Sequence, residues 1–168
     1  AAFFIGRRRW VARGGTAEAF ENIVLVAIPC GIVGARIYHV LTHWGDYFGP
    51  GHMNPWAIWE GGIAMFGSLI GGAIGAAIAA RVVRARLWAF ADCVAPGIAV
   101  AQAIGRLGNW FNQELFGYPS TAPWALEIDV AHRPAGMEQY ATFEPTFLYE
   151  LLLNLLAALI ILRLDKAL

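Results

Sequence analysis

The sequence predicts an all-α fold: a polytopic transmembrane helical bundle with about four full spans, a partial first span and a small extracytoplasmic loop region. The composition is 58% hydrophobic and only 14% charged. A soluble protein of this size could not cover its surface with so few charges, so bilayer lipid is the natural solvent for the remainder. No hydrophilic linker divides the chain, and we therefore expect a single membrane domain over residues 1–168.

The elements follow from apolar stretches that are each about 20 residues long, as a bilayer requires. A partial helix is expected to end by Ile5, and the outer loops are expected over about 42–58 and 111–144. The full spans are predicted at about 20–41, 59–80, 87–110 and 145–162. In the second outer loop, the stretch ALEIDV predicts one short strand. Because the chain begins and ends close to apolar helix, we expect it to be a fragment that lacks parts of both ends.

Basic residues occupy alternate loops, which predicts the orientation of the spans. They lie between spans one and two, between spans three and four, and after span five: Arg7, Arg8, Arg9, Arg13, Arg81, Arg84, Arg86, Arg163 and Lys166. The other two loops contain only Arg133. By the positive-inside rule the basic loops are cytoplasmic and the other two face outward. The four histidines, His39, His43, His52 and His132, fall on or near the outer side.

Four ionisable residues are predicted at the depth of the outer headgroups, each on a different span: Arg36, Glu60, Arg106 and Glu150. Snorkelling or a helix-stabilising ion pair would explain any one of them. Four at one level favour a functional site, because an ionisable group in a span is costly unless it faces protein, water or headgroups.

Span four carries a polar stripe whose members recur at spacings of three and four or multiples of them: Asp92, Gln102, Arg106, Asn109 and Gln113. These residues share one helix face, and that face cannot point at lipid tails. Asp92 is the weakest member, because it lies near the cytoplasmic boundary where solvent can reach it. Glu150 and Asn154 share a face of span five in the same way.

Other features favour packing rather than chemistry. Gly67, Gly71 and Gly75 form two successive G-x-x-x-G steps, which are typical of close helix contacts in membranes. Cys30 and Cys93 sit in apolar stretches and are interpreted as small buried hydrophobic residues. The histidines lack ligand spacing, so we expect no metal and no cofactor. A formal net charge of zero does not suggest nucleic acid as a partner.

The segment GRLGNWFNQELFG, residues 105–117, resembles the signature of the prolipoprotein diacylglyceryl transferase family. Further resemblances keep the order of that family along nearly the whole chain. They are GARIYHV from Gly34, WEGG from Trp59, DCVAPGIAVAQAIGR before the signature, and PTFLYE from Pro145. The resemblance implies a multi-pass enzyme of the bacterial plasma membrane, with its active site toward the extracytoplasmic side.

The implied reaction moves a diacylglyceryl group from phosphatidylglycerol to the lipobox cysteine thiol of a preprolipoprotein signal peptide and releases glycerol phosphate. We expect Arg106 and Glu150 to be catalytic, because the planar fork of arginine suits a departing phosphate and Glu150 can orient it. Arg36 is either a second anionic anchor or the ion-pair partner of Glu150 or Glu60, and Glu114 is a second candidate for orienting an arginine. The expected substrate-binding residues, with membrane lipid as a further contact, are Arg106, Asn109, Asn112, Gln113, Glu114, Gly117, Arg36, Glu60 and Tyr149.

The sequence also departs from the family pattern. Many members carry a histidine, to which a catalytic role has been given, where this chain has Phe66, and often a histidine where it has Glu144. The high-GC branch of the family commonly lacks the first of these. No residue stands out as a general base.

Two other classes remain open at this stage. A membrane transporter or channel subunit with outer-side ion pairs would predict polar residues through the full membrane depth, whereas here they concentrate near the outer ends. A structural assembly subunit would use the G-x-x-x-G face and would not need the stripe around Arg106.

Overall fold

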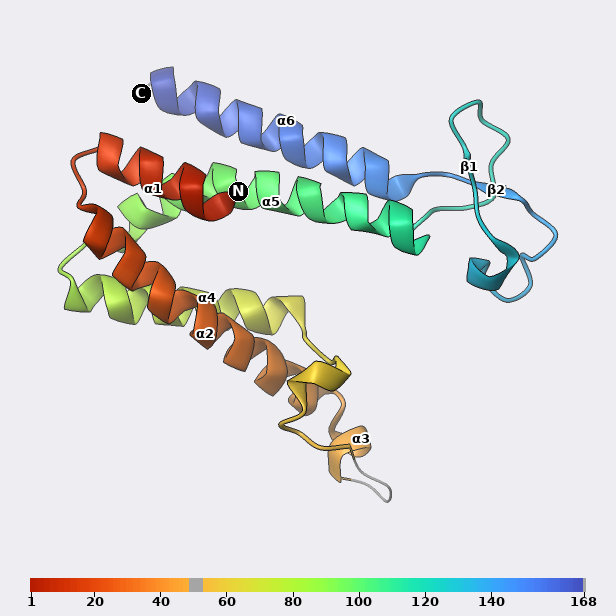
Figure 1. Cartoon of the computed structure of the whole chain (residues 1–168), viewed down its shortest axis with the longest axis horizontal. Helices are drawn as coiled ribbons and strands as arrows, with labels where there is room; N and C mark the ends of the chain where they lie inside the picture. The colour runs from red at the N-terminus through yellow and green to blue at the C-terminus, as the bar shows by residue number, and fades with distance from the viewer. Residues whose placement is uncertain (49–52, 168) are drawn as a thin grey trace. The chain divides into compact units, whose positions relative to one another are not determined.

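The structure is a computed structural model that describes residues 1–48 and 53–167 (Figure 1). His52, predicted on the outer side, lies outside the described residues, as does the side chain of Glu60. The elements in chain order are α1 Ala2–Ala12, α2 Ala17–Thr42, α3 Trp44–Phe48, η1 Ile58–Glu60, α4 Met65–Val82, α5 Leu87–Asn112, β1 Leu126–Glu127, η2 Val130–His132, β2 Thr142–Phe143 and α6 Thr146–Ala167.

The chain forms two compact units. One consists of Arg7–Cys93, and the other of Ala1–Gly6 together with Val94–Leu168. The prediction of one membrane domain concerns folding as a unit and stays a prediction.

Four helices, α2, α4, α5 and α6, are long and apolar enough to cross a membrane. The last of them is the clearest case: its window has a mean hydropathy of 2.0, yet only 11% of that window is buried inside the protein. Leucines exposed in this way require an apolar environment such as lipid tails. The predicted all-α polytopic membrane fold is confirmed, and the protein is a multi-pass membrane protein.

The two largest differences from the predicted helix boundaries lie at the end of α1 and the start of α4. Helix α1 continues past Ile5 to Ala12, because arginines are good helix formers and the first residue able to end the helix is Gly14, with φ +84°. Helix α4 begins at Met65 rather than near residue 59, because Gly61 and Gly62 have φ +92° and +76° and interrupt the helical path after η1.

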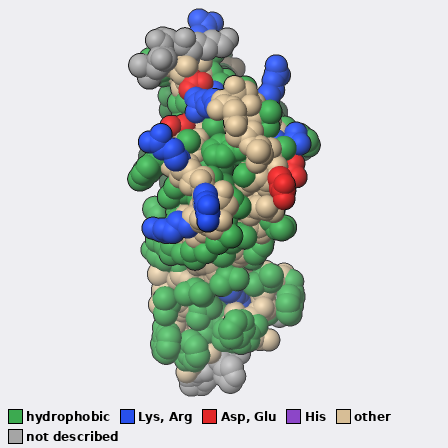
Figure 2. All heavy atoms as spheres, turned by 90° about the vertical axis from the view of Figure 1, so that its left-hand side faces the viewer, with side chains coloured by type: hydrophobic (Ala, Val, Ile, Leu, Met, Phe, Trp, Pro, Cys, Tyr) green, Lys and Arg blue, Asp and Glu red, His purple; other side chains and the backbone are tan. Residues whose placement is uncertain are grey.

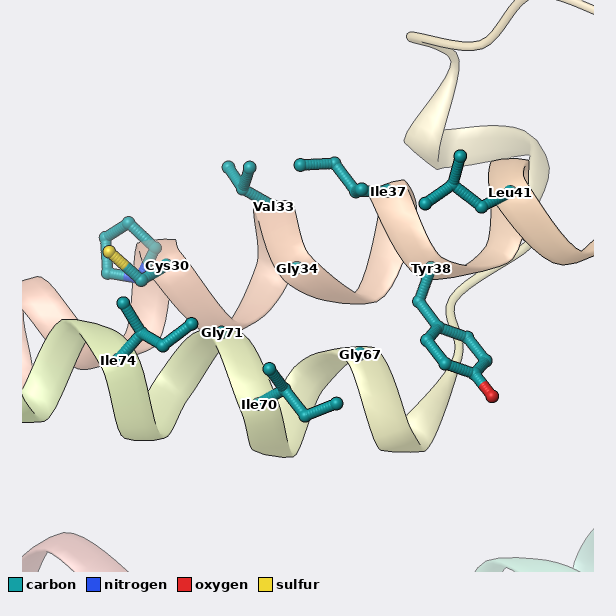
Figure 3. Close-up of a pocket in the computed structure, with 11 residues that line it drawn as sticks. Cys30, Val33, Gly34, Ile37, Tyr38, Leu41, Gly67, Ile70, Gly71 and Ile74 are labelled. Carbon is teal, nitrogen blue, oxygen red and sulfur yellow. The ribbon is translucent and has the colours of Figure 1, made fainter.

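Helices α2 and α4 pack against each other through their glycines in the first unit. A Cβ atom placed on Gly34 would lie 2.5 Å from the Gly67 carbonyl oxygen and 2.8 Å from the Gly71 Cα. The two backbones therefore touch directly, and the packing interpretation of the G-x-x-x-G steps is confirmed. An apolar groove of about 470 Å³ lies beside this contact, walled by residues that include Val33 and Ile70 (Figure 3).

Basic residues lie away from the predicted site residues within each unit. In the first unit, Arg13 and Arg84 lie in the turns before α2 and after α4, at the opposite end of these antiparallel helices from Arg36. In the second unit, Arg163 lies near the far end of α6 from Glu150. Figure 2 shows Lys and Arg side chains set among hydrophobic ones on the face that it views.

The outer loop of the second unit folds around a small sheet. Strands β1 and β2 pair antiparallel, with Leu126 opposite Phe143 and Glu127 opposite Thr142. On the other side of β2, Pro119 forms a bridge to Phe143. The strand expected from ALEIDV is present as β1, whereas its partner β2 was not predicted.

Candidate functional site

An ion pair joins α5 to α6 near the ends that flank the outer loop (Figure 1). Arg106 Nη2 lies 2.5 Å from Glu150 Oε2, and the two side chains are 32% and 47% exposed. Arg106 lies about two turns before the end of α5 and Glu150 about one turn into α6. Each residue is thus positioned by a helix. The part of the Arg106 guanidinium that does not contact Glu150 lies at a partly exposed surface.

The sequence after Arg106 ends α5 in a specific way. The Glu114 N–H donates to the Asn109 carbonyl at 3.1 Å, while Gln113 has φ +50°. This is the Schellman arrangement, with glutamine in the left-handed position that glycine usually takes. The strained position is held by the Gln113 side chain: its Oε1 accepts from the Asp129 N–H at 2.7 Å, and its Nε2 donates to Asp129 Oδ2 at 2.9 Å.

Aromatic side chains fix the start of α6. Trp110 on α5 contacts Phe147 edge-to-face, with ring centroids 6.2 Å apart. Trp124 Nε1 donates to the Tyr149 hydroxyl at 2.8 Å. The Thr146 hydroxyl donates to the Leu115 carbonyl at 2.6 Å and ties the first turn of α6 to the segment that follows α5. These contacts hold Glu150 at the level of Arg106.

Arg36 lies in the first unit and is 6% exposed. Among the described residues, its guanidinium donates to backbone carbonyls, those of Asn54, Pro55, Gly61 and Gly62, at 2.6–3.2 Å. The Tyr47 ring covers it, with Cζ 5.0 Å from the ring centroid. These carbonyl dipoles tie residues 54–62 to α2.

The remaining predicted substrate-binding residues make fewer side-chain contacts among the described residues. Asn112 and Glu114 are exposed and make no side-chain hydrogen bond or ion pair within the part of the chain that the structure describes. The Gly117 N–H donates to the Glu144 carbonyl at 2.7 Å, and a Cβ there would lie 2.8 Å from Thr146. Phe66, where many members of the resembled family carry histidine, is 65% exposed and lies near Tyr38.

Sequence reasoning missed Asp129 and Trp124, which position Gln113 and Tyr149. Both partners come from the outer loop and are separated by 16 and 25 residues from the side chains they hold. No helical spacing connects them, so only the flanking ALEIDV strand pattern could have drawn attention to Asp129.

A family model described as prolipoprotein diacylglyceryl transferase matches residues 1–167. The chain belongs to the prolipoprotein diacylglyceryl transferase family. The family recognised from residues 105–117 and the accompanying motifs is therefore confirmed. The match gives no support to the transporter alternative.

Three curated relatives in this family are named phosphatidylglycerol–prolipoprotein diacylglyceryl transferase. The one from Streptomyces coelicolor, numbered 2 in its name, is 54% identical over 164 residues, covering 96% of this chain and 52% of its own length. The one from Cutibacterium acnes is 50% identical over 167 residues, covering 98% of this chain and 56% of its own length. The one from Frankia alni is 52% identical over 167 residues, covering 98% and 44%. The chain spans about half the length of the curated relatives it matches.

Proposed function

We propose that the complete protein containing this chain is a transferase that moves the diacylglyceryl group of phosphatidylglycerol onto the lipobox cysteine thiol of a prolipoprotein. The names of the relatives supply the two substrates. The single structural observation that supports a role for this part of the protein is the ion pair between Arg106, on the polar face of α5, and Glu150 of α6.

The chemistry is a displacement at a glycerol carbon. The thiol loses its proton, its sulfur forms the new bond to that carbon, and the carbon–oxygen bond to phosphate breaks, so glycerol phosphate leaves with the electron pair. A free thiol with a pKa near about 8.5 is only about 3% thiolate at pH 7. The reaction therefore gains from positive charge both at the sulfur and at the leaving phosphate.

Arg106 suits the leaving group because a guanidinium can donate two parallel hydrogen bonds to phosphate. Glu150 holds one nitrogen of that group at 2.5 Å and so sets the orientation of the fork. Asn109 and Gln113 follow on the same helix face and would contact the glycerol or the peptide, with Tyr149 and Gly117 nearby in the sequence motifs. Arg36, Glu60, Asn112 and Glu114 are further proposed substrate contacts.

The proposed site faces the extracytoplasmic side. This follows from the positive-inside rule, because the basic residues lie at the helix ends opposite the site in each unit. Phosphatidylglycerol of the outer leaflet and a signal peptide that has crossed the membrane would then meet at the same level.

The test is Arg106→Ala in the complete protein. We expect transfer from labelled phosphatidylglycerol to a lipobox peptide to fall about 100-fold, since one donor at a developing charge contributes about 3 kcal/mol. Arg106→Lys retains the charge without the fork and should fall to an intermediate rate. Arg163→Ala, an exposed arginine near the other end of α6, is the matched control and should transfer normally.

Membrane insertion and thermal unfolding of each variant separate loss of chemistry from loss of fold. An Arg106→Ala variant with full transfer would contradict the role of Arg106. A parent protein without transfer would contradict the proposed function itself.

A further inference from the structure

The outer edge of β1 carries backbone groups that the fold leaves unused. Ile128 N–H donates to the Ala141 carbonyl at 3.0 Å, which makes Ile128 and, two residues earlier, Leu126 the positions that bond to β2. In an antiparallel ladder the intervening residue points its backbone groups the other way. The Glu127 N–H and C=O therefore face away from β2, and neither has a partner within the described residues.

A cavity of about 100 Å³ lies along this edge, between β1 and the helices α5 and α6. Its walls are formed by Asn109, Trp110, Gln113, Leu126, Glu127, Ile128 and Phe147. The Asn109 side-chain nitrogen is buried and has no hydrogen-bond partner in the part of the chain that the structure describes. A cavity of this volume is large enough to hold water or a peptide group.

Asp129, the next residue on the same edge of β1, shows which kind of group can bond to the backbone there. Asp129 lies two residues after Glu127, so its N–H also faces away from β2. That N–H is bonded by the side-chain amide of Gln113, which accepts at 2.7 Å. One helical turn earlier on α5, Asn109 lines the cavity beside Glu127. The backbone N–H of Asp129 is thus bonded to a side-chain amide, whereas the backbone of Glu127 borders a cavity.

We propose that this cavity binds the main chain of one prolipoprotein residue, in extended conformation, next to the reacting cysteine. The C=O of that residue accepts from the Glu127 N–H and the N–H of the same residue donates to the Glu127 carbonyl, so the substrate extends the β1–β2 sheet by a third strand. The Asn109 side-chain amide donates to another backbone carbonyl oxygen of the same peptide. The proposal rests on the proposed function, which supplies the prolipoprotein as substrate.

The location suits the chemistry. Asn109 is three residues after Arg106 on α5, a rise of about 4.5 Å along the helix. Phe147 is likewise three residues before Glu150 on α6. A peptide held at Glu127 therefore lies about one helical turn from the Arg106–Glu150 pair, close enough for an adjacent cysteine side chain to reach a headgroup bound there. Recognition through backbone groups also allows one site to accept many prolipoprotein sequences.

The experiment is Glu127→Pro in the complete protein, with KM measured separately for a lipobox peptide and for phosphatidylglycerol. Proline removes the edge N–H but leaves the ladder to β2 intact, because Glu127 does not bond to β2. We expect KM for the peptide to rise about fivefold to tenfold, as the loss of one hydrogen bond predicts, with KM for phosphatidylglycerol unchanged. Thr121→Pro places the same ring at an exposed site of the same loop, away from the cavity, and should alter neither value.

A second measurement does not depend on the folding of a proline variant. A photoreactive amino acid at exposed position 127 should crosslink to labelled lipobox peptide and be competed by unlabelled peptide, whereas the same group at position 121 should not. An unchanged KM for the peptide in Glu127→Pro together with no crosslink at 127 overturns the proposal. Loss of fold in Glu127→Pro with no crosslink at 127 also overturns it, because the edge is then used by the protein itself. A parent that transfers nothing but still crosslinks at 127 would reject the proposed reaction and keep the peptide site.

Discussion

The contact between α2 and α4 can be tested with two adjacent glycines on one helix. A Cβ on Gly71 would strike the Cys30 carbonyl oxygen and lie 3.0 Å from the Gly34 Cα. A Cβ on Gly72 would meet its nearest atoms, in Ala27 and Gly31, at 3.7 and 4.0 Å, which is ordinary van der Waals contact. Gly71→Ala should therefore destabilise the protein, and Gly72→Ala should not.

The magnitude follows from the backbone nature of the obstacle. The Cys30 carbonyl belongs to α2 and cannot rotate away like a side chain, so the helices must separate to admit the methyl group. Overpacking of this kind costs about 1–3 kcal/mol. Both variants gain the same helix propensity over glycine, about 1 kcal/mol, and the gain cancels in the comparison. We expect Gly71→Ala to be about 2 kcal/mol less stable than Gly72→Ala, about 30-fold in the folding equilibrium.

The assay is the free energy of unfolding of the purified protein in mixed micelles, with a denaturing detergent added stepwise. Each variant is compared with the parent at the same protein and detergent concentrations. A difference between the two variants of less than about 0.5 kcal/mol would refute the reasoning, because it would mean that α2 and α4 do not approach at Gly71 as described.

Three other predictions concern polar contacts. Arg36→Lys should lower the local stability of residues 54–62 by about 2 kcal/mol, because an ammonium cannot reach four carbonyls arranged around a planar fork; limited proteolysis measures this loss. Gln113→Ala should speed hydrogen exchange of the Asp129 N–H about fivefold, since the side-chain acceptor is lost; mass spectrometry of exchanged peptides measures it. Hydrogen bonds from its own N–H and that of Gly136 hold the pKa of Glu138 below its ordinary value. The turn they form should be fully stable above about pH 4.3 and loosen as pH falls below it through the lowered pKa, which exchange rates at the Gly136 N–H would show.

Each of these has a distinct contrary result. Unchanged proteolysis of Arg36→Lys would mean that the carbonyl cradle does not hold the segment. Equal exchange at Asp129 in parent and variant would place its N–H on another acceptor. If the exchange rate of the Gly136 N–H simply follows the intrinsic pH dependence, the Glu138 carboxylate does not accept a hydrogen bond from it.

The sequence predicted the spans and one polar face because both depend on local periodicity. Arg106, Asn109 and Gln113 share a face of α5 whatever surrounds the helix. The partner of Glu150 could not be chosen, because Arg36 and Arg106 were expected at the same depth and only tertiary packing selects one. In the structure Arg106 forms the ion pair with Glu150, and Arg36 donates hydrogen bonds to backbone carbonyls.

The parts that escaped prediction depend on conformations and distant contacts. The start of α4 was misplaced because nothing in WEGG shows that both glycines take positive φ. The bond between Gln113 and Asp129 joins a helix end to an irregular loop, where no period applies. Asn109 was expected to bind substrate, and that role remains a prediction even though its amide nitrogen lies buried without a partner in the described structure.

The cradle around Arg36 has a consequence for how the protein can diverge. The groups that hold the guanidinium are carbonyls, which every amino acid possesses, so this contact does not itself fix the side chains at positions 54 and 55. Gly62 is different, since a Cβ there would lie 2.6 Å from Arg36 Nη1 and from His39. Over evolutionary time such a site would retain an arginine, a glycine and a loop of fixed length. Its conservation would then be one of backbone shape.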